Sequence, residues 1–308
     1  MWGAPGSGKT TFLAALDIAL KRRRYGFTMA GMTDASVNLL IEMTDRLIVK
    51  REFPKTTGAI DYFEWELFRN QQQAADSPLG TPVPFGPNRI TLSLTDPSGE
   101  LARPEKRIDP ERKKLIDDLA DSDGILFMFD PIREFEVGDA FSTTNGLLHQ
   151  LTAAVASRDR DRFDGTLPQH VAICLTKFDE PKVLATAKKL GIVARYRDDP
   201  HQLPWVHEHN ALKLLTALTL VSGSGDGEML LNALHQAFPG RVKFFITSAV
   251  GFYVNPMTGR FDEDDPQNLV KTAAGLSTPG ESRIRGALYP INVVEPILWL
   301  SEQIARRA

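Results

Sequence analysis

Hydrophobic and polar positions follow two different periods along this chain. Three near-continuous apolar runs of six or seven residues fit parallel strands that are buried on both faces. Three further segments are rich in β-branched and aromatic residues, and one of them alternates apolar and polar positions regularly. The six predicted strands are Tyr25–Gly31, Ala59–Phe68, Arg89–Thr95, Gly124–Asp130, His170–Thr176 and Val242–Ser248.

Helical spacing of apolar residues fills most of the sequence between these strands. In the first such segment Phe12, Leu16 and Leu20 share one helical face. The predicted helices are Lys9–Arg23, Asp34–Arg51, Asp109–Asp121, Thr144–Arg158, Trp205–Leu220, Glu228–Phe238 and Ile291–Arg307. Strands that alternate with helices predict an α/β fold with a doubly wound, mostly parallel sheet.

Three segments are rich in turn-forming or polar residues and interrupt this pattern. Ser77–Pro87 reads as a long hairpin connection, and Ser222–Gly227 reads as a flexible hinge before a helix. Arg260–Ser282 is polar and broken, and its pattern assigns no element. Since none of these resembles a boundary between autonomous units, we expect one domain over residues 1–308, with insertions at about 25–51 and 181–226.

Composition narrows the class of protein. The chain has 308 residues, of which 42% are hydrophobic and 24% charged, which is typical of a folded globular protein. The net charge of −3 provides no electrostatic footprint for nucleic acid. The single cysteine, Cys174, lies in an apolar run and predicts an inert core thiol. No apolar run is long enough to cross a membrane, so we expect a cytoplasmic protein without integral membrane contact.

The clearest chemical motif lies at residues 3–10, which read GAPGSGKT and match the pattern G-x-x-x-x-G-K-[ST] without a mismatch. Glycines allow successive backbone N–H groups to turn toward phosphates, and the following helix adds its positive N-terminal dipole. The lysine reaches the β- and γ-phosphates, and the threonine hydroxyl binds Mg²⁺. The residues expected to contact a nucleotide here are Gly3, Gly6, Ser7, Gly8, Lys9, Thr10 and Thr11.

A phosphate loop connects a strand to a helix, yet only Met1 and Trp2 precede this motif. A central strand normally has about five or six residues. Losing several buried apolar side chains, each worth about 1.5–3 kcal/mol, would rival the whole stability of a domain. We therefore expect the first strand to be truncated and the true start of the chain to lie upstream.

A second motif, Asp96-Pro97-Ser98-Gly99, directly follows the predicted strand Arg89–Thr95. An acidic residue at such a strand end can hold Mg²⁺ through water. The N–H of Gly99 can bond a γ-phosphate, and that bond exists only in the triphosphate state. Asp96 is therefore a candidate metal residue and Gly99 a candidate nucleotide contact.

A third motif, Thr176-Lys177-Phe178-Asp179, ends the strand His170–Thr176. The Asp179 carboxylate can accept hydrogen bonds from the ring N–H and the exocyclic amine of guanine, whereas adenine presents an acceptor there. The Lys177 stem would cover the base and reach the phosphate loop. Ser248 and Ala249, at the end of the last predicted strand, would complete the pocket through backbone contacts.

The ordered series GAPGSGKT, DPSG, TKFD and SA, each at a strand end, resembles the Ras-like and translation-factor-related class of P-loop GTPases. The resemblance covers residues 3–249, and Ile291–Arg307 is similar to the closing helix of that fold. It implies that the protein binds GTP or GDP with Mg²⁺ and hydrolyses GTP. It assigns Lys9 and Thr10 to phosphate and Mg²⁺, Asp179 to guanine, and Lys177 to its support.

The same resemblance nominates residues for the two switch segments. Thr56-Thr57-Gly58 resembles the Thr-x-Gly pattern of small GTPases, which makes Thr56 a candidate Mg²⁺ ligand and Thr57 its competitor. Glu100 stands where Ras-type proteins have the Gln that orients the attacking water. A carboxylate adds negative charge near the γ-phosphate, so we expect slow hydrolysis without a partner. Arg103 and Arg107 lie in the same loop and could neutralise charge in the transition state, although exposed arginines in such a loop are usually solvated.

Two long insertions and the ending PINVVEPILWL are similar to bacterial "double-GTPase" proteins of conflict or signalling systems. That narrower resemblance implies a nucleotide-dependent switch for an effector or activating protein, which could be a second GTPase. Two alternatives stay open. Asp130 could be the metal-site acid of a P-loop ATPase, or the protein could be a catalytically degenerate GTP-binding scaffold.

Overall fold

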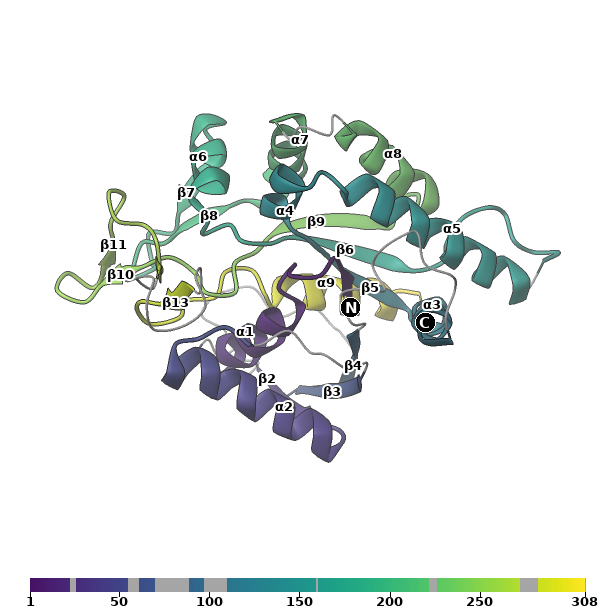
Figure 1. Ribbon diagram of the computed structural model, residues 1–308, viewed down its shortest axis with the longest axis horizontal. Coiled ribbons are helices and arrows are strands. Elements are labelled where there is room, and N and C mark those ends of the chain that lie inside the picture. Colours follow the sequence, from purple (N-terminus) through teal and green to yellow (C-terminus); the bar gives the residue numbers. More distant parts are fainter. Residues whose placement is uncertain are drawn as a thin grey trace.

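The structure is a computed structural model that describes residues 1–22, 26–54, 61–69, 89–96, 110–158, 160–221, 226–271 and 282–307. Its elements form three layers, with a central parallel sheet between helices on both faces (Figure 1). The fold is therefore α/β, as the alternation of strands and helices predicts.

The central sheet has four parallel strands in the order β1-β5-β6-β9. They span Trp2–Gly3 (β1), Gly124–Phe129 (β5), His170–Leu175 (β6) and Val242–Ile246 (β9). All five residues after Gly124 in β5 are buried, and so are all five after His170 in β6. These strands confirm the prediction that the near-continuous apolar runs are strands covered on both faces.

Successive side chains of these strands enter two separate hydrophobic clusters. Ile125 and Phe127 pack on one face, against helices α3, α5, α7 and α8, whereas Leu126 and Met128 pack on the other, against α1 and α9. Cys174 lies in the second cluster, and burial raises the pKa of its thiol. The alternation of a strand thus supplies two cores from one apolar run.

Helices cover both faces of the parallel sheet. The helices are α1 Lys9–Arg22, α2 Asp34–Asp45, α3 Pro110–Asp121, α4 Pro131–Glu136, α5 Ala140–Arg158, α6 Pro181–Lys189, α7 Ala211–Val221, α8 Gly227–Ala237 and α9 Glu295–Ala305. A π-helical turn, Arg46–Lys50, extends α2 and ends at Arg51, whose φ is +57°.

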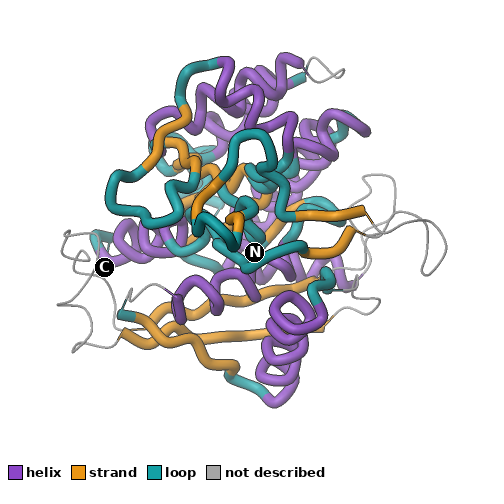
Figure 2. Tube along the Cα trace, turned by 90° about the vertical axis from the view of Figure 1, so that its left-hand side faces the viewer, coloured by secondary structure: helices purple, strands orange, loops and turns teal. Residues whose placement is uncertain are grey.

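Three strands on the far side of α1 form a separate antiparallel sheet with the order β2-β3-β4. They span Phe27–Gly31 (β2), Asp61–Arg69 (β3) and Arg89–Asp96 (β4). Figure 2 shows them side by side in the lower part of the molecule, next to the α2 helix. Their inner residues, among them Phe63, Trp65 and Leu94, pack into the same core as α1.

The expected single, mostly parallel sheet is therefore divided in the structure. A hydrogen bond connects the two sheets: the amino group of Met1, just before β1, donates to the Ser93 carbonyl of β4 at 2.9 Å. Since β1 also pairs with β5, it lies between the two sheets. With two residues, β1 is too short to pair along the length of either neighbour.

The segment between β6 and β9 differs most from the sequence expectation. The predicted helix Trp205–Leu220 is wrong at its start: Pro204–Val206 is strand β8, which pairs with β7 (Val193–Arg195), and a 3₁₀ turn, Glu208–Asn210, precedes α7. Trp205 stacks on Tyr196, the residue after β7, with ring centroids 4.0 Å apart, so strand pairing and aromatic stacking override the helical spacing.

Short hairpins occupy the polar region before α9. Val254–Asn255 (β10) pairs with Arg260–Phe261 (β11), and Leu269–Lys271 (β12) pairs with Ser282–Ile284 (β13). The two-residue and three-residue strands are too short to leave a periodic signal in the sequence.

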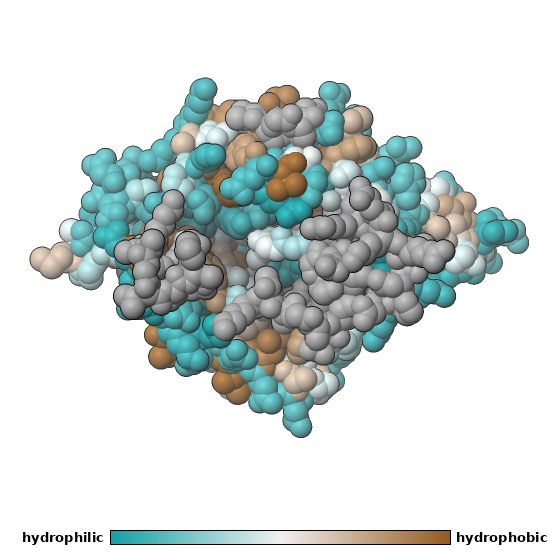
Figure 3. All heavy atoms as spheres, viewed as in Figure 1, coloured by the Kyte–Doolittle hydropathy of each residue, from teal (hydrophilic) through white to brown (hydrophobic). Residues whose placement is uncertain are grey.

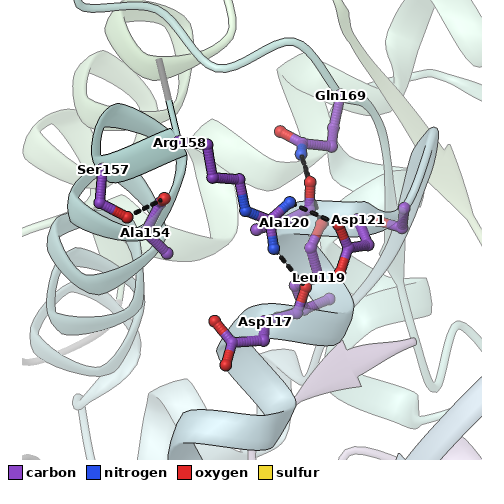
Figure 4. Close-up of polar contacts among 9 residues, drawn as sticks. Asp117, Leu119, Ala120, Asp121, Ala154, Ser157, Arg158 and Gln169 are labelled. Carbon is purple, nitrogen blue, oxygen red and sulfur yellow. Dashed lines mark hydrogen bonds and ion pairs between the residues drawn. The ribbon is translucent and has the colours of Figure 1, made fainter. Parts of the chain in front are cut away.

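The ends of α3 and α5 are tied together by polar contacts (Figure 4). Arg158 of α5 donates to the Asp121 carboxylate at 2.5 Å and to the Asp117 carbonyl at 3.3 Å. The buried Gln169 amide, just before β6, donates to the Leu119 and Ala120 carbonyls at 3.3 and 3.2 Å. These contacts satisfy terminal carbonyls of α3, which fixes the helix beside the sheet.

On the face shown in Figure 3, apolar atoms gather at the lower edge, over α2. They include Ile41, which is 62% exposed. Within the described ranges, no helix has the length and apolar character to cross a membrane.

Candidate functional site

The glycine-rich motif forms a tight turn between β1 and the first residue of α1, Lys9. Gly6 and Gly8 have φ angles of +75° and +91°, a region that L side chains rarely adopt. A Cβ on Gly3 would lie 2.7 Å from both the Met128 carbonyl oxygen and Ser7 Oγ. The motif therefore needs its glycines for backbone conformation at two positions and for close packing at a third.

Two polar side chains of this turn are buried. Lys9 Nζ donates to the Gly3 and Ala4 carbonyls at 3.0 and 3.4 Å, so the ammonium group lies over the turn itself. The Ser7 hydroxyl oxygen is buried and has no hydrogen-bond partner within the described part of the chain. A buried hydroxyl without a partner and a buried ammonium beside a helix N-terminus are suited to an anionic ligand.

A cavity of about 430 Å³ opens directly over this turn. It lies at the carboxyl ends of the parallel strands, since it is lined by the turn after β1, by Thr176 and Lys177 after β6, and by Thr247 and Ala249 after β9. Ligands of open parallel sheets bind at this edge. The cavity brings three of the sequence motifs together: residues 3–10, Thr176–Asp179 and Ser248–Ala249.

Asp179 lines the same cavity as the glycine-rich turn and is buried. The Ser248 hydroxyl donates to Asp179 Oδ1 at 2.5 Å and accepts a hydrogen bond from the Gly251 N–H at 2.7 Å. Burial raises the pKa of Asp179 to about 6, against the lowering effect of the Ser248 hydrogen bond. Ser248 thus acts through its side chain, whereas the sequence predicted backbone contacts alone.

Lys177 takes a left-handed backbone conformation, with φ of +59°. Its ammonium group donates to Asp130 Oδ2 at 2.6 Å. Asp130 Oδ1 accepts from the backbone N–H groups of Ile132 and Arg133, so this carboxylate caps α4. Thr176, whose hydroxyl donates to the Phe129 carbonyl at 3.0 Å, fixes the neighbouring strand end. The sequence did not predict that the Lys177 and Asp130 side chains pair.

Part of the predicted site lies outside the described residues. Thr56, Thr57, Gly99, Glu100 and arginines 103 and 107 belong to it. Asp96 is described only as the last residue of β4, where it pairs with Asp61. Among the residues that the structure does describe, no cluster of three His, Cys, Asp or Glu side chains could hold a metal ion. The predicted roles of these residues in Mg²⁺ binding and switching stay predictions.

The cavity also has walls that the sequence did not reveal. Phe53 and Pro54, from the segment after α2, line it together with Val250 and with Leu269 and Ser282 of the β12–β13 hairpin. Most of these residues are apolar, so they add hydrophobic wall to the cavity. Such residues carry no motif, and only their spatial convergence identifies them. The nearest signal in the sequence is Thr56, a predicted site residue that shortly follows Phe53 and Pro54.

The site thus brings an electropositive turn and a buried carboxylate to the walls of one cavity, which is large enough for a small-molecule ligand. No protein-family model matches the chain, and neither the curated proteins nor the solved structures searched contain a match.

Proposed function

We propose that this protein is a P-loop GTPase of the G-domain type that binds GTP or GDP with Mg²⁺ and acts as a nucleotide-dependent switch. One observation supports this proposal above the others. The glycine-rich turn, with Lys9 and Thr10, and the buried carboxylate of Asp179 line the same cavity, although they are about 170 residues apart in the chain.

The turn suits the phosphate end of a nucleotide. The N–H groups before α1 and the helix dipole favour an anion at this position. A bound phosphate would compete with the Gly3 and Ala4 carbonyls for the Lys9 ammonium, which already lies within the turn. The Ser7 hydroxyl would gain a partner there, which offsets the cost of its burial.

The opposite end suits guanine. A carboxylate accepts hydrogen bonds and cannot donate them, so Asp179 fits a base edge with two N–H donors and repels an adenine ring nitrogen. The Ser248 hydroxyl holds Oδ1 of this carboxylate in place. Apolar walls, among them Val250 and Leu269, would cover a planar base.

The residues that would hold Mg²⁺ are Thr10, Asp96 and Thr56, of which the structure describes the Thr10 side chain at the start of α1. When bound, the ion neutralises charge on the β- and γ-phosphates. Glu100 would orient the attacking water, and its charge keeps hydrolysis slow until a partner assists. Because a nucleotide-dependent switch acts on other proteins, the proposal includes an effector or activating protein as its partner.

The ATPase alternative places the metal-site acid at Asp130. In the structure, two backbone N–H groups of α4 bond Asp130 Oδ1, and Lys177 Nζ bonds Oδ2. Both carboxylate oxygens have partners, and the carboxylate would lose them to bind an ion. This observation favours the guanine proposal over the ATPase, whereas a GTP-binding scaffold without turnover stays a second candidate.

Calorimetric titration of the 308-residue chain with GDP and with ADP, both with Mg²⁺, tests the proposal. We expect GDP binding at least 100-fold tighter than ADP binding, because ADP leaves Asp179 without a donor. Asp179→Asn should weaken GDP binding by a similar factor. Glu180→Gln is the matched control, since this neighbouring carboxylate lines the cavity and caps no N–H of α6 with its side chain.

Equal affinity for GDP and ADP, or an unchanged GDP affinity in Asp179→Asn, would contradict guanine recognition. Single-turnover hydrolysis of GTP then separates the switch from the scaffold. A measurable rate that changes at least tenfold in Glu100→Ala supports a GTPase, and the absence of turnover in both proteins supports a scaffold.

A further inference from the structure

The polar region before α9 contributes a buried side-chain amide close to the candidate site. Asn268, the residue before β12, is 1% exposed. Its Nδ2 donates to the Val250 and Ala287 carbonyls at 3.2 and 3.0 Å, and its Oδ1 accepts from the Gly286 N–H at 2.8 Å. Two carbonyl acceptors and one N–H donor fix which way the amide lies, so both of its N–H groups are used.

One of these carbonyls belongs to a peptide group that also acts on Asp179. The Val250 carbonyl and the Gly251 N–H are the two ends of the same peptide group. That N–H donates to Ser248 Oγ at 2.7 Å, and the Ser248 hydroxyl donates to Asp179 Oδ1 at 2.5 Å. Asn268 is therefore connected to the Asp179 carboxylate through one peptide group and one hydroxyl, and all three side chains are buried.

The orientation of this peptide group is fixed by its surroundings. Gly251 has a φ of +70°, and a Cβ there would lie 2.0 Å from the Tyr289 carbonyl oxygen, so the position requires glycine. The Tyr289 N–H donates to the Val250 carbonyl at 3.2 Å, beside the bond from Asn268. The carbonyl thus accepts two hydrogen bonds while the N–H of the same peptide group points to Ser248.

The peptide group decides the direction of the Ser248 hydroxyl. The Ser248 backbone pairs with Ile291 in both directions, at 3.0 and 2.8 Å, so its place does not depend on the side chain. A hydroxyl has one hydrogen to donate, and the bond from the Gly251 N–H occupies the oxygen and leaves that hydrogen for Asp179. A peptide group whose carbonyl accepts a hydrogen bond is also a stronger N–H donor.

We propose that Asn268 is a positioning residue for Asp179: its bond to the Val250 carbonyl directs the Ser248 hydroxyl onto the carboxylate that accepts the N–H groups of the base. This inference rests on the proposed function, in which Asp179 recognises guanine. Asn268 is not among the described residues that line the cavity, so it acts through the Val250–Gly251 peptide group and Ser248 rather than by touching a ligand.

The chain offers a matched control for the loss of a buried amide. Gln169 is also 1% exposed and donates to two backbone carbonyls, those of Leu119 and Ala120 at the end of α3. Neither carbonyl belongs to a residue that lines the candidate site. Asn268→Leu and Gln169→Leu therefore remove the same kind of group, and only the first change reaches Asp179.

The pKa of Asp179 in the nucleotide-free 308-residue chain is the direct readout. NMR follows its carboxyl carbon, which is assigned by its loss in Asp179→Asn. Since the Ser248 hydrogen bond lowers this pKa, we expect Asn268→Leu to raise the titration midpoint by about 0.3 pH unit or more. Glu180 and Lys177 also act on Asp179, and both are kept in every variant. Gln169→Leu should leave the midpoint unchanged.

Two further measurements separate positioning from a general loss of structure. Asn268→Leu should weaken GDP binding by about fivefold but leave pyrophosphate binding, with Mg²⁺, within about twofold, because it acts on the carboxylate and not on the glycine-rich turn. In a Ser248→Ala background, Asn268→Leu should give no further shift of the midpoint, because its effect passes through the Ser248 hydroxyl.

The inference is overturned if Asn268→Leu leaves the midpoint of Asp179 unchanged, or if Gln169→Leu shifts it equally. A full shift by Asn268→Leu in the Ser248→Ala background would also overturn it. Should Asn268→Leu not fold, the same criteria apply to Asn268→Ala, which leaves room for water beside the two carbonyls. Failure of the unaltered chain to bind GDP would contradict the proposed function, whereas the titration needs no nucleotide and still decides whether Asn268 acts on Asp179.

Discussion

The two halves of the central sheet differ in how completely they are built. β5, β6 and β9 pair over five or six residues, and side chains of the strand ends are held by buried hydrogen bonds, such as that between Ser248 and Asp179. The half around β1 has two paired residues and one link to β4. The strand ends that carry Asp179 and Ser248 thus belong to the half with long pairing, and the glycine-rich turn belongs to the β1 half.

This difference indicates that the two ends of the cavity are stabilised in different ways. The part of the cavity around Asp179 is held by its sheet and by the Ser248 hydrogen bond, which lowers the cost of ordering it when a ligand binds. The glycine-rich turn follows the two paired residues of β1, and contacts within the turn, including Lys9 to Gly3, hold it in place. Substitutions in these two parts of the cavity should therefore differ in their effects on ligand affinity and on the free energy of unfolding.

The largest expected effect is on phosphate recognition. Lys9→Met should weaken GDP binding by about 10²–10³-fold and leave guanosine binding within about twofold, because in the proposed complex the ammonium contacts the phosphates and not the base. Titration of both ligands measures this. Lys21→Met, at the exposed end of α1, is the matched control. If Lys9→Met weakened guanosine and GDP equally, the two ends of the cavity would not act separately.

Gly3→Ala tests how tightly β1 packs against β5. The added methyl group would lie 2.7 Å from the Met128 carbonyl oxygen, so we expect a loss of about 1–3 kcal/mol in the free energy of unfolding. Gly146→Ala in α5 is the control, because nothing lies within 4 Å of the position that its added methyl group would take, and the change should stabilise the helix by about 0.4–1 kcal/mol. Urea denaturation measures the free energy of unfolding of both variants. An unchanged midpoint for Gly3→Ala would show that the backbone around β1 rearranges at little cost to accommodate the methyl group.

The pH dependence of GDP binding probes the part of the cavity around Asp179. Since the pKa of Asp179 is raised to about 6, protonation below pH 6 removes the acceptor that guanine needs. Affinity should be constant from pH 7 to 8 and fall toward tenfold weaker by pH 5. The unbound protein changes in the opposite sense, because a raised carboxyl pKa adds stability as pH falls from 6 to 4. Asp179→Asn should abolish both trends, and a dependence that persists would assign it to another group.

The smallest expected effect is that of Ser248→Ala. The variant loses the hydrogen bond to Asp179 and the acceptor for the Gly251 N–H, so GDP binding should weaken by about three- to tenfold. The onset of weaker binding should also move above pH 6, because that hydrogen bond lowers the pKa of Asp179. Ser157→Ala, on the exposed side of α5, provides the control. An unchanged affinity and pH profile would mean that Asp179 is positioned by the backbone.

The sequence by itself determined the features that depend on local chemistry. Apolar runs such as Gly124–Phe129 form strands because both faces are buried, and the alternation with helices sets the α/β class. The glycine-rich motif forms a turn before α1 because Gly6 and Gly8 adopt positive φ.

Which side chains meet depends on the tertiary packing. Nothing in the sequence pairs Lys177 with Asp130 or Ser248 with Asp179, because such contacts depend on which strands become neighbours. The same holds for Trp205, whose helical spacing gave way to stacking on Tyr196 across a strand pair. The cavity over the glycine-rich turn likewise has walls from segments that are distant in sequence. Hydrogen-bond partners and cavities arise from packing over long range, whereas sequence periodicity reports only each segment's own surface.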